Sequence, residues 1–163
     1  DFLERYLPAQ PGQIETINGL PLGKHSGLMY YTLGQRQGIG VGGTKDHAEA
    51  PWYVVDKDMQ RNVLIVAQGN ENEHLYSTNL SAKTPSWINH RHPSLPLTCA
   101  AKIRYRQADQ ACQVNHCDPQ SVTVSFSRPQ RAVTPGQYIV FYEGDVCLGG
   151  AIIEKFFRQA AAA

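Results

Sequence analysis

The sequence predicts a mainly β protein, in which a small mixed α/β unit rich in strands is followed by a small closed β-barrel. Apolar and polar residues alternate through residues 97–106 and 122–126, which is the period of half-buried strands. Turn residues punctuate the chain, as in Asn18-Gly19 and Glu143-Gly144-Asp145. A polar, aperiodic stretch at residues 69–75 divides the chain. We therefore predict domains at residues 1–72 and 73–157, followed by a tail at residues 158–163.

The first part begins with the end of a helix at residues 1–7, which Pro8 and Pro11 stop. A strand follows at residues 13–17, and Asn18-Gly19 predicts a tight hairpin turn after it. A short helix is expected at residues 28–33. The predicted strands at residues 52–56 and 63–67 form a second hairpin.

The second part contains only strand patterns. The predicted strands lie at residues 97–106, 122–126, 138–142 and 146–153, and the last two are joined by the turn at residues 143–145. Several short strands at regular spacing, separated by Pro and Gly, are typical of a small closed barrel.

Composition indicates a folded protein with no overall basic field. The chain has 163 residues, of which 42% are hydrophobic and 18% charged, and its formal net charge is +1. Any nucleic-acid contact must therefore come from a local patch. No apolar run is long enough to cross a bilayer, so we predict no membrane partner and a cytoplasmic protein.

One such patch is predicted from strand phase. Alternation through residues 97–106 places Lys102, Arg104 and Arg106 on one face and Tyr105 on the other. Three cations on one face suit a phosphate-binding stripe. On charge alone, however, a solvated outer strand of the barrel is the better interpretation.

Cysteine and histidine give no metal-binding pattern. The four cysteines contain no CxxC pair, and Cys99 and Cys112 fall on the apolar phase of their strands, where cysteine acts as a small hydrophobic residue. The nearest approach to a ligand set is Cys112 with His116 and Cys117. Consecutive residues on a strand point to opposite faces, so we predict no metal site there.

Glycine is concentrated in residues 23–43, GKHSGLMYYTLGQRQGIGVGG. The end of this segment superficially suggests a phosphate loop, but Thr44 precedes Lys45, whereas that motif needs Lys before Ser or Thr. His25 is best interpreted as a hydrogen-bonded structural histidine.

Three parts of the chain resemble the bacterial tRNA-specific 2-thiouridylases of the MnmA/TrmU type. They are the glycine-rich segment, the opening FLERYLPAQPG, and the pair KIRYRQ and VTPGQYIVFYEGDVCLGGAIIE, in the family's order. The resemblance implies the family's middle domain and its C-terminal domain, a six-stranded antiparallel barrel similar to domain 2 of elongation factor Tu. It also implies that the ATP-binding domain and both catalytic cysteines lie outside this chain, which would then be inactive alone and bind no cofactor.

The resemblance also implies site residues. Arg104 and Tyr105 match the family's Arg-Tyr pair that contacts tRNA, and Gln137 matches its Gln after the TPG turn. Lys102 and Arg106 are added from strand phase alone. The glycine-rich segment is expected to face another domain or tRNA through five residues: His25, Tyr31, Gln35, Arg36 and Lys45. A purely structural turn region explains that segment equally well.

The function that follows from the resemblance is ATP-dependent sulfur transfer to C2 of the wobble uridine of tRNA. The implied partners are the anticodon region of tRNA, an N-terminal ATP-binding domain of the same polypeptide, and a cysteine desulfurase or persulfide relay. A free-standing RNA- or protein-binding barrel is the alternative. A flavin-binding barrel is a second one, although no Ser or Thr follows Tyr105 as its motif requires.

Overall fold

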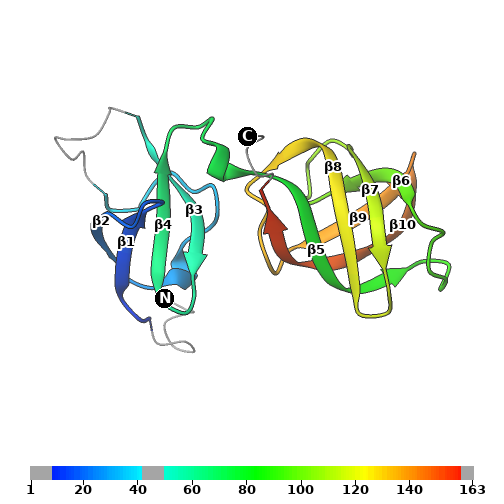
Figure 1. Cartoon of the computed structure of the whole chain (residues 1–163), viewed down its shortest axis with the longest axis horizontal. Coiled ribbons are helices and arrows are strands. Elements are labelled where there is room, and N and C mark those ends of the chain that lie inside the picture. The colour runs from blue at the N-terminus through cyan, green and yellow to red at the C-terminus, as the bar shows by residue number, and fades with distance from the viewer. Residues whose placement is uncertain (1–8, 42–49, 159–163) are drawn as a thin grey trace. The chain divides into compact units, whose positions relative to one another are not determined.

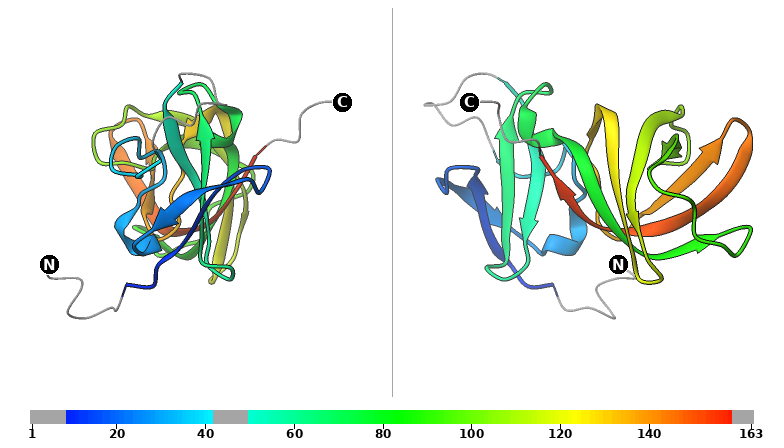
Figure 2. Two further views of the ribbon diagram at one scale, coloured as in Figure 1. Left: turned by 90° about the vertical axis from the view of Figure 1, so that its left-hand side faces the viewer. Right: turned by 45° about the vertical axis from the view of Figure 1, so that its right-hand side comes forward.

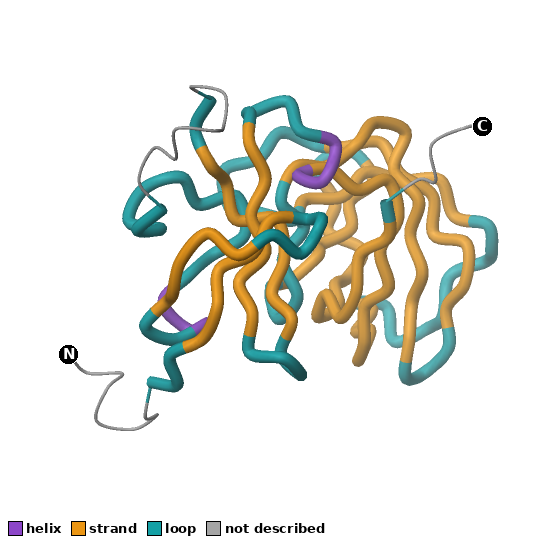
Figure 3. Tube along the Cα trace, turned by 60° about the vertical axis from the view of Figure 1, so that its left-hand side comes forward, coloured by secondary structure: helices purple, strands orange, loops and turns teal. Residues whose placement is uncertain are grey.

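The protein is mainly β and divides into two compact units, and the division falls between Leu75 and Tyr76. The computed structural model describes residues 9–41 and 50–158. Strands dominate the described chain, and its helical parts are single short turns (Figures 1 and 3). The mainly β class predicted from the sequence is therefore confirmed. The helix predicted at residues 1–7 lies outside the described residues, as does Lys45.

The first unit is built on a four-stranded mixed sheet. Its strands are β1 (Gly12–Thr16), β2 (Pro21–His25), β3 (Trp52–Asp58) and β4 (Val63–Gln68), in the order β2-β1-β4-β3 (Figure 1). β1 is antiparallel to β2 and parallel to β4, and β3 and β4 form the second predicted hairpin. The core of the unit contains Ile14, Leu28, Val54, Leu64 and Val66.

Local sequence explains two turns of this unit. At the predicted Asn18-Gly19 turn, Gly19 has φ 78° and its N–H donates to the carbonyl of Thr16 at 2.9 Å. The prediction of a helix at residues 28–33 is wrong in length, because only a 3₁₀ turn forms there. This turn is η2 (Leu28–Tyr30). Gly34 follows with φ 80° and donates its N–H to the carbonyl of Val54, which draws the chain back to the sheet instead of continuing a helix.

The second unit is a closed barrel of six strands, all paired antiparallel. They are β5 (Tyr76–Trp87), β6 (Leu97–Lys102), β7 (Gln110–Cys117), β8 (Ser121–Arg131), β9 (Tyr138–Glu143) and β10 (Val146–Phe157). Around the barrel the order is β10-β5-β8-β7-β6-β9. A short 3₁₀ turn, η3 (Glu73–Leu75), ends the first unit immediately before β5.

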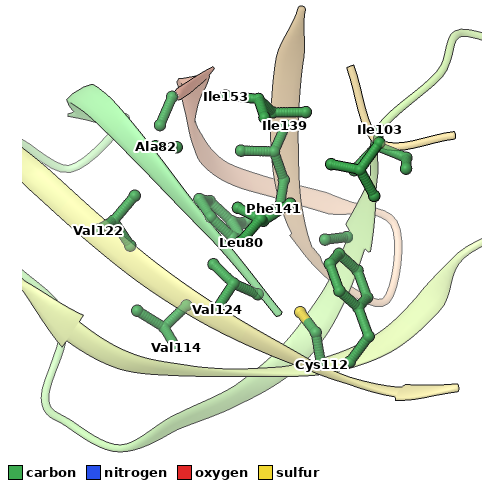
Figure 4. Close-up of a cluster of buried hydrophobic side chains, with 14 of the residues drawn as sticks. Leu80, Ala82, Ile103, Cys112, Val114, Val122, Val124, Ile139, Phe141 and Ile153 are labelled. Carbon is green, nitrogen blue, oxygen red and sulfur yellow. The ribbon is translucent and has the colours of Figure 1, made fainter. Parts of the chain in front are cut away.

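Alternating inward residues of these strands fill the barrel. Val114, Ile139 and Phe141 are fully buried, and Figure 4 shows the cluster that they form with the other inward side chains. Trp87 stacks on Phe141 with 5.3 Å between ring centroids. Cys112 belongs to this cluster and Cys99 packs against it, which agrees with their prediction as small hydrophobic residues.

The barrel closes where β10 bends past the end of β5. Register shifts interrupt this pairing, and Figure 2 shows the curvature of β10 in orange to red. At Gly149 a Cβ atom would lie 2.3 Å from the carbonyl oxygen of Ser86. Only glycine allows the two backbones to approach this closely.

No helix among the described residues is long and apolar enough to span a membrane.

Candidate nucleic-acid interface

β6 ends at Lys102, four residues before the end of the predicted strand. Beyond it the N–H of Gln107 donates to the carbonyl of Arg104 at 3.2 Å, and the N–H of Ile103 donates to the side-chain Oε1 of Gln107 at 3.0 Å. Residues 104–107 therefore form a turn, which we call the RYRQ turn. The prediction of a cationic stripe along one strand face is wrong, because strand phase does not extend past Lys102.

Because β6 ends at Lys102, the side chain of Tyr105 is exposed to solvent. Continued alternation would have buried this ring in the barrel, whereas the turn leaves it 93% exposed. The guanidinium of Arg106 lies 6.0 Å from the centroid of the Tyr105 ring. An exposed aromatic ring beside a cation suits stacking on an unpaired nucleic-acid base.

Arg104 anchors the RYRQ turn to the connection between β8 and β9 (residues 132–137). Its Nη2 donates to the carbonyl of Arg131 at 2.6 Å and to that of Ala132 at 3.0 Å. Ala132 has φ 51°, a left-handed conformation that non-glycine residues adopt at a cost. The bonds from Arg104 hold the carbonyls on either side of this strained residue. Burial, and secondarily the charge of Arg131, lower the pKa of Arg104.

Hydrogen bonds among three glutamine side chains also hold the RYRQ turn. Gln107 Nε2 donates to Gln130 Oε1 at 2.8 Å, and Gln130 Nε2 donates to Gln110 Oε1 at 3.1 Å. Gln130 is 3% exposed, so these bonds satisfy an amide that would otherwise be buried at a cost. Sequence reasoning missed this network. Only the polar Gln130 at the end of an apolar strand pattern could have indicated it.

Gln137 is exposed and lies immediately before β9. The turn before it is fixed by Gly136, whose φ is 87° and whose N–H donates to the carbonyl of Ile153 at 2.8 Å. The N–H of Ile153 in turn donates to the carbonyl of Gln137 at 2.8 Å. This pair of bonds fixes the backbone of Gln137.

The pairing of β6 with β9 brings these residues to one end of the barrel. The strands are antiparallel with Lys102 opposite Val140, so the chain leaving β6 lies beside the start of β9. The RYRQ turn and the β8–β9 connection thus form one surface, linked by the bonds of Arg104. Lys102 is placed differently, since its Nζ lies 3.2 Å from Asp109 Oδ1 and 5.1 Å from the centroid of the Tyr142 ring. Its charge is already paired.

The glycine-rich segment presents less surface than the sequence predicts. His25 is 2% exposed, with Nε2 3.1 Å from the carbonyl oxygen of Asn62, as expected for a structural histidine. Tyr31 is 8% exposed and packs edge-on against His25. The prediction that these two side chains face another domain or tRNA is contradicted, because buried groups offer no surface.

The remaining described residues of that segment differ from one another. The amide of Gln35 serves the loop itself, since Oε1 accepts from the N–H of Thr32 at 3.0 Å and Nε2 donates to the carbonyl of Gln37 at 2.8 Å. Arg36 is exposed and can reach a ligand. The first unit also has a pocket of about 310 Å³ without an ionisable side chain among the described residues that line it: Thr16, Ile17, Asn18, Leu20, Trp52, Val66, Ala67, Gln68 and Asn72.

Two close contacts of cysteine side chains lie outside the RYRQ turn, one with another cysteine and one with a histidine. The sulfur atoms of Cys99 and Cys112 lie 3.7 Å apart on neighbouring strands, and the hydrogen bond to Cys99, together with burial, raises the pKa of Cys112. Cys117 Sγ lies 3.6 Å from His92 Nδ1. Within residues 9–41 and 50–158, no three His, Cys, Asp or Glu side chains are grouped to hold a metal ion.

Two family domains match the chain in sequence. Residues 1–68 match the tRNA methyl transferase PRC-barrel domain, and residues 77–153 match the aminomethyltransferase β-barrel domain. The tRNA-specific 2-thiouridylase MnmA of Marinomonas sp. (strain MWYL1) is 57% identical over 98% of this chain and 41% of its own length. The chain belongs to the tRNA-specific 2-thiouridylase family.

Other 2-thiouridylases align over the same region. MnmA of Alcanivorax borkumensis is 57% identical over 95% of this chain and 43% of its own length. MnmA of Tolumonas auensis is 56% identical over 96% of this chain and 42% of its own length. The chain thus spans about two fifths of the length of these curated relatives.

Proposed function

We propose that this chain supplies the tRNA-binding domains of a tRNA-specific 2-thiouridylase, which transfers sulfur to C2 of the wobble uridine. The observation that carries the proposal is the almost fully exposed Tyr105 on a turn fixed by Arg104, in a family whose named members act on tRNA. A ring held out on a rigid turn loses little conformational entropy when a base stacks on it.

Each residue of the surface has a distinct proposed role. Tyr105 stacks on an unpaired base, and Gln137 offers an amide to a base edge or ribose. Arg106 contacts phosphate, and Arg104 both positions the turn and directs its remaining N–H groups to RNA. Lys102 has the weakest case, because phosphate would have to displace Asp109 from its ammonium group.

The chemistry of sulfur transfer is proposed to reside in the longer protein. There ATP would adenylate the uridine oxygen, and the terminal sulfur of a cysteine persulfide supplied by a desulfurase or relay would attack C2 and expel AMP. The second catalytic cysteine would then break the S–S bond by forming a disulfide with the first, which leaves the sulfur on C2. Adenylation makes a good leaving group of an oxygen that a thiol cannot displace directly. We expect this chain alone to bind tRNA in the cytoplasm and to transfer no sulfur.

The test is binding of the chain to a tRNA with a wobble uridine across a salt series. Arg104→Ala should weaken binding and flatten the log–log salt slope by roughly 0.7 to 0.9 for each phosphate that the protein no longer neutralises. Tyr105→Ala should weaken binding with an unchanged slope, since stacking carries no charge. The matched controls are Arg91→Ala and Ile88→Ala, both exposed in the connection that precedes β6. Equal binding by all four variants would refute the proposed surface.

A further inference from the structure

The end of the barrel that holds Tyr105 carries a second exposed aromatic ring. Tyr138, the first residue of β9, is 66% exposed, whereas Ile139 and Phe141 on the same strand are fully buried. Alternation therefore directs the Tyr138 ring to the outside of the barrel. A single exposed aromatic residue is ordinary on a protein surface. Two exposed aromatic rings at the same end of one barrel call for a functional explanation.

Strand pairing establishes that both rings lie at the same end. β6 and β9 are antiparallel with Lys102 opposite Val140, so Tyr105 after β6 and Tyr138 at the start of β9 both lie beyond this pair. Arg104 belongs to the same surface, because it lies in the RYRQ turn and bonds the connection that leads to β9.

A second arginine stands where β8 leads into this connection. Arg131 ends β8, and its main-chain carbonyl is one of the two that Arg104 holds. Its charge is close enough to oppose that of Arg104, whose pKa is lowered by burial and then by this repulsion. Two like charges held near each other become more stable when an anion binds between them.

Resting on the proposed function, we infer that Arg131 and Tyr138 belong to the RNA-binding surface. Arg131 and Arg104 bind neighbouring backbone phosphates of an unpaired strand, and Tyr138 stacks on a base next to the nucleotide held by Tyr105. The ligand is single-stranded RNA, because only unpaired bases expose their faces to two rings while their phosphates reach the neighbouring cations.

The two side chains make separable contributions that binding assays can distinguish. Removing a stacking ring reduces affinity by roughly 5- to 150-fold and leaves the salt slope unchanged. Removing a cation that neutralises a phosphate flattens the slope by about 0.7 on a single strand. Tyr138→Ala should show the first effect, and Tyr138→Phe should retain wild-type affinity because it keeps the ring. Arg131→Gln should show the second effect while its main-chain carbonyl still accepts the bonds from Arg104.

The experiment measures binding of the 163-residue chain to a fluorescein-labelled anticodon stem-loop with a wobble uridine, at several salt concentrations. Ile88→Ala and Arg91→Gln are the matched controls, since both residues are exposed in the connection entering β6, at the opposite end of that strand. Thermal melts confirm that each variant is folded. Tyr138→Ala and Arg131→Gln should weaken binding, and the controls should not.

Other results would overturn the inference in distinguishable ways. If Tyr105→Ala weakens binding but Tyr138→Ala and Arg131→Gln do not, the inference fails and the proposed function survives. If Tyr138→Phe weakens binding as much as Tyr138→Ala, the hydroxyl acts and stacking is refuted. If the wild-type chain binds no RNA, both the inference and the RNA-binding role proposed for this chain fail together.

Discussion

Replacing Arg104 by Lys separates the two roles that this residue combines. The substitution keeps a positive charge at the RYRQ turn but removes the planar fork whose Nη2 lies 2.6 Å from the carbonyl oxygen of Arg131 and 3.0 Å from that of Ala132. Both bonds come from the single atom Nη2, and the lysine chain is one bond shorter, so we expect its flexible ammonium group to reach one of these carbonyls but not to hold both. The turn should therefore loosen while the local charge stays the same.

The magnitude follows from these two bonds. A hydrogen bond from a charged donor contributes about 1.5–3 kcal/mol where water is excluded. Although burial of part of the guanidinium lowers the pKa of Arg104, the residue as a whole remains exposed to solvent, so we take about 1 kcal/mol for the bond that Lys fails to replace. A loss of that size lowers the melting temperature of a domain as small as this barrel by roughly 4–8 °C.

The assay pairs a thermal melt with RNA binding across a salt series, and Arg91→Lys is the control in both. We expect Arg104→Lys to melt several degrees earlier and to bind RNA more weakly with the wild-type salt slope. An unchanged melting temperature together with unchanged RNA affinity would refute the anchoring role. An unchanged melting temperature with weaker binding would show instead that the fork acts directly on RNA.

Three further predictions concern the barrel. Gly149→Ala should cost about 2–3 kcal/mol in denaturant unfolding, because its Cβ would lie 2.3 Å from a backbone oxygen, whereas Gly144→Ala, at φ 56° with open space around it, should cost about 1 kcal/mol. Equal losses would show that close approach does not matter there. Asp118 accepts hydrogen bonds from the imidazole of His116 and from the backbone N–H groups of Gln120 and Ser121, and these bonds hold the pKa of Asp118 far below its usual value. The stability that the ionised Asp118 adds to the folded protein is therefore present above about pH 4 and is lost as the pH falls. Asp118→Asn should therefore lower the melting temperature at pH 7, and the difference should close toward pH 2; a constant difference would contradict this. Mild oxidation with diamide should remove two of the four thiols by joining Cys99 to Cys112, whose sulfur atoms lie 3.7 Å apart, and Cys99→Ser should retain all three of its thiols when both proteins are unfolded for counting.

The fold was predictable from the sequence wherever the pattern was local. Asn18-Gly19 placed the first hairpin because a tight turn needs a residue that tolerates positive φ, and Gly19 has φ 78°. β5 was not predicted, since its buried residues do not alternate evenly. Register shifts interrupt its pairing between Ser77 and Asn79, and Thr84 has φ 49°. These irregularities depend on neighbouring strands that are distant in the chain.

The candidate site was even less predictable from local sequence than the fold. Alternation continued in the sequence through Arg106, but β6 ends at Lys102, where its partner β9 is already near its first residue. The position of that end depends on the β8–β9 connection, which no local pattern around residue 102 contains. The exposure of Tyr105 and the bonds of Arg104 to residues 131 and 132 therefore required the structure.

The charge of the chain constrains how such a surface can bind RNA. With a formal net charge of +1, the protein has no long-range field to hold RNA nonspecifically. If Arg104, Arg106 and Arg131 each contact one phosphate, the log–log salt slope should be only about −2 to −3. Most of the affinity must then come from stacking and from polar contacts to bases, which salt does not screen. A slope much steeper than −3 would mean that cations outside this end of the barrel make the main contacts. A shallow slope, with binding abolished when the two tyrosine rings are removed, would instead identify a surface that selects unpaired bases.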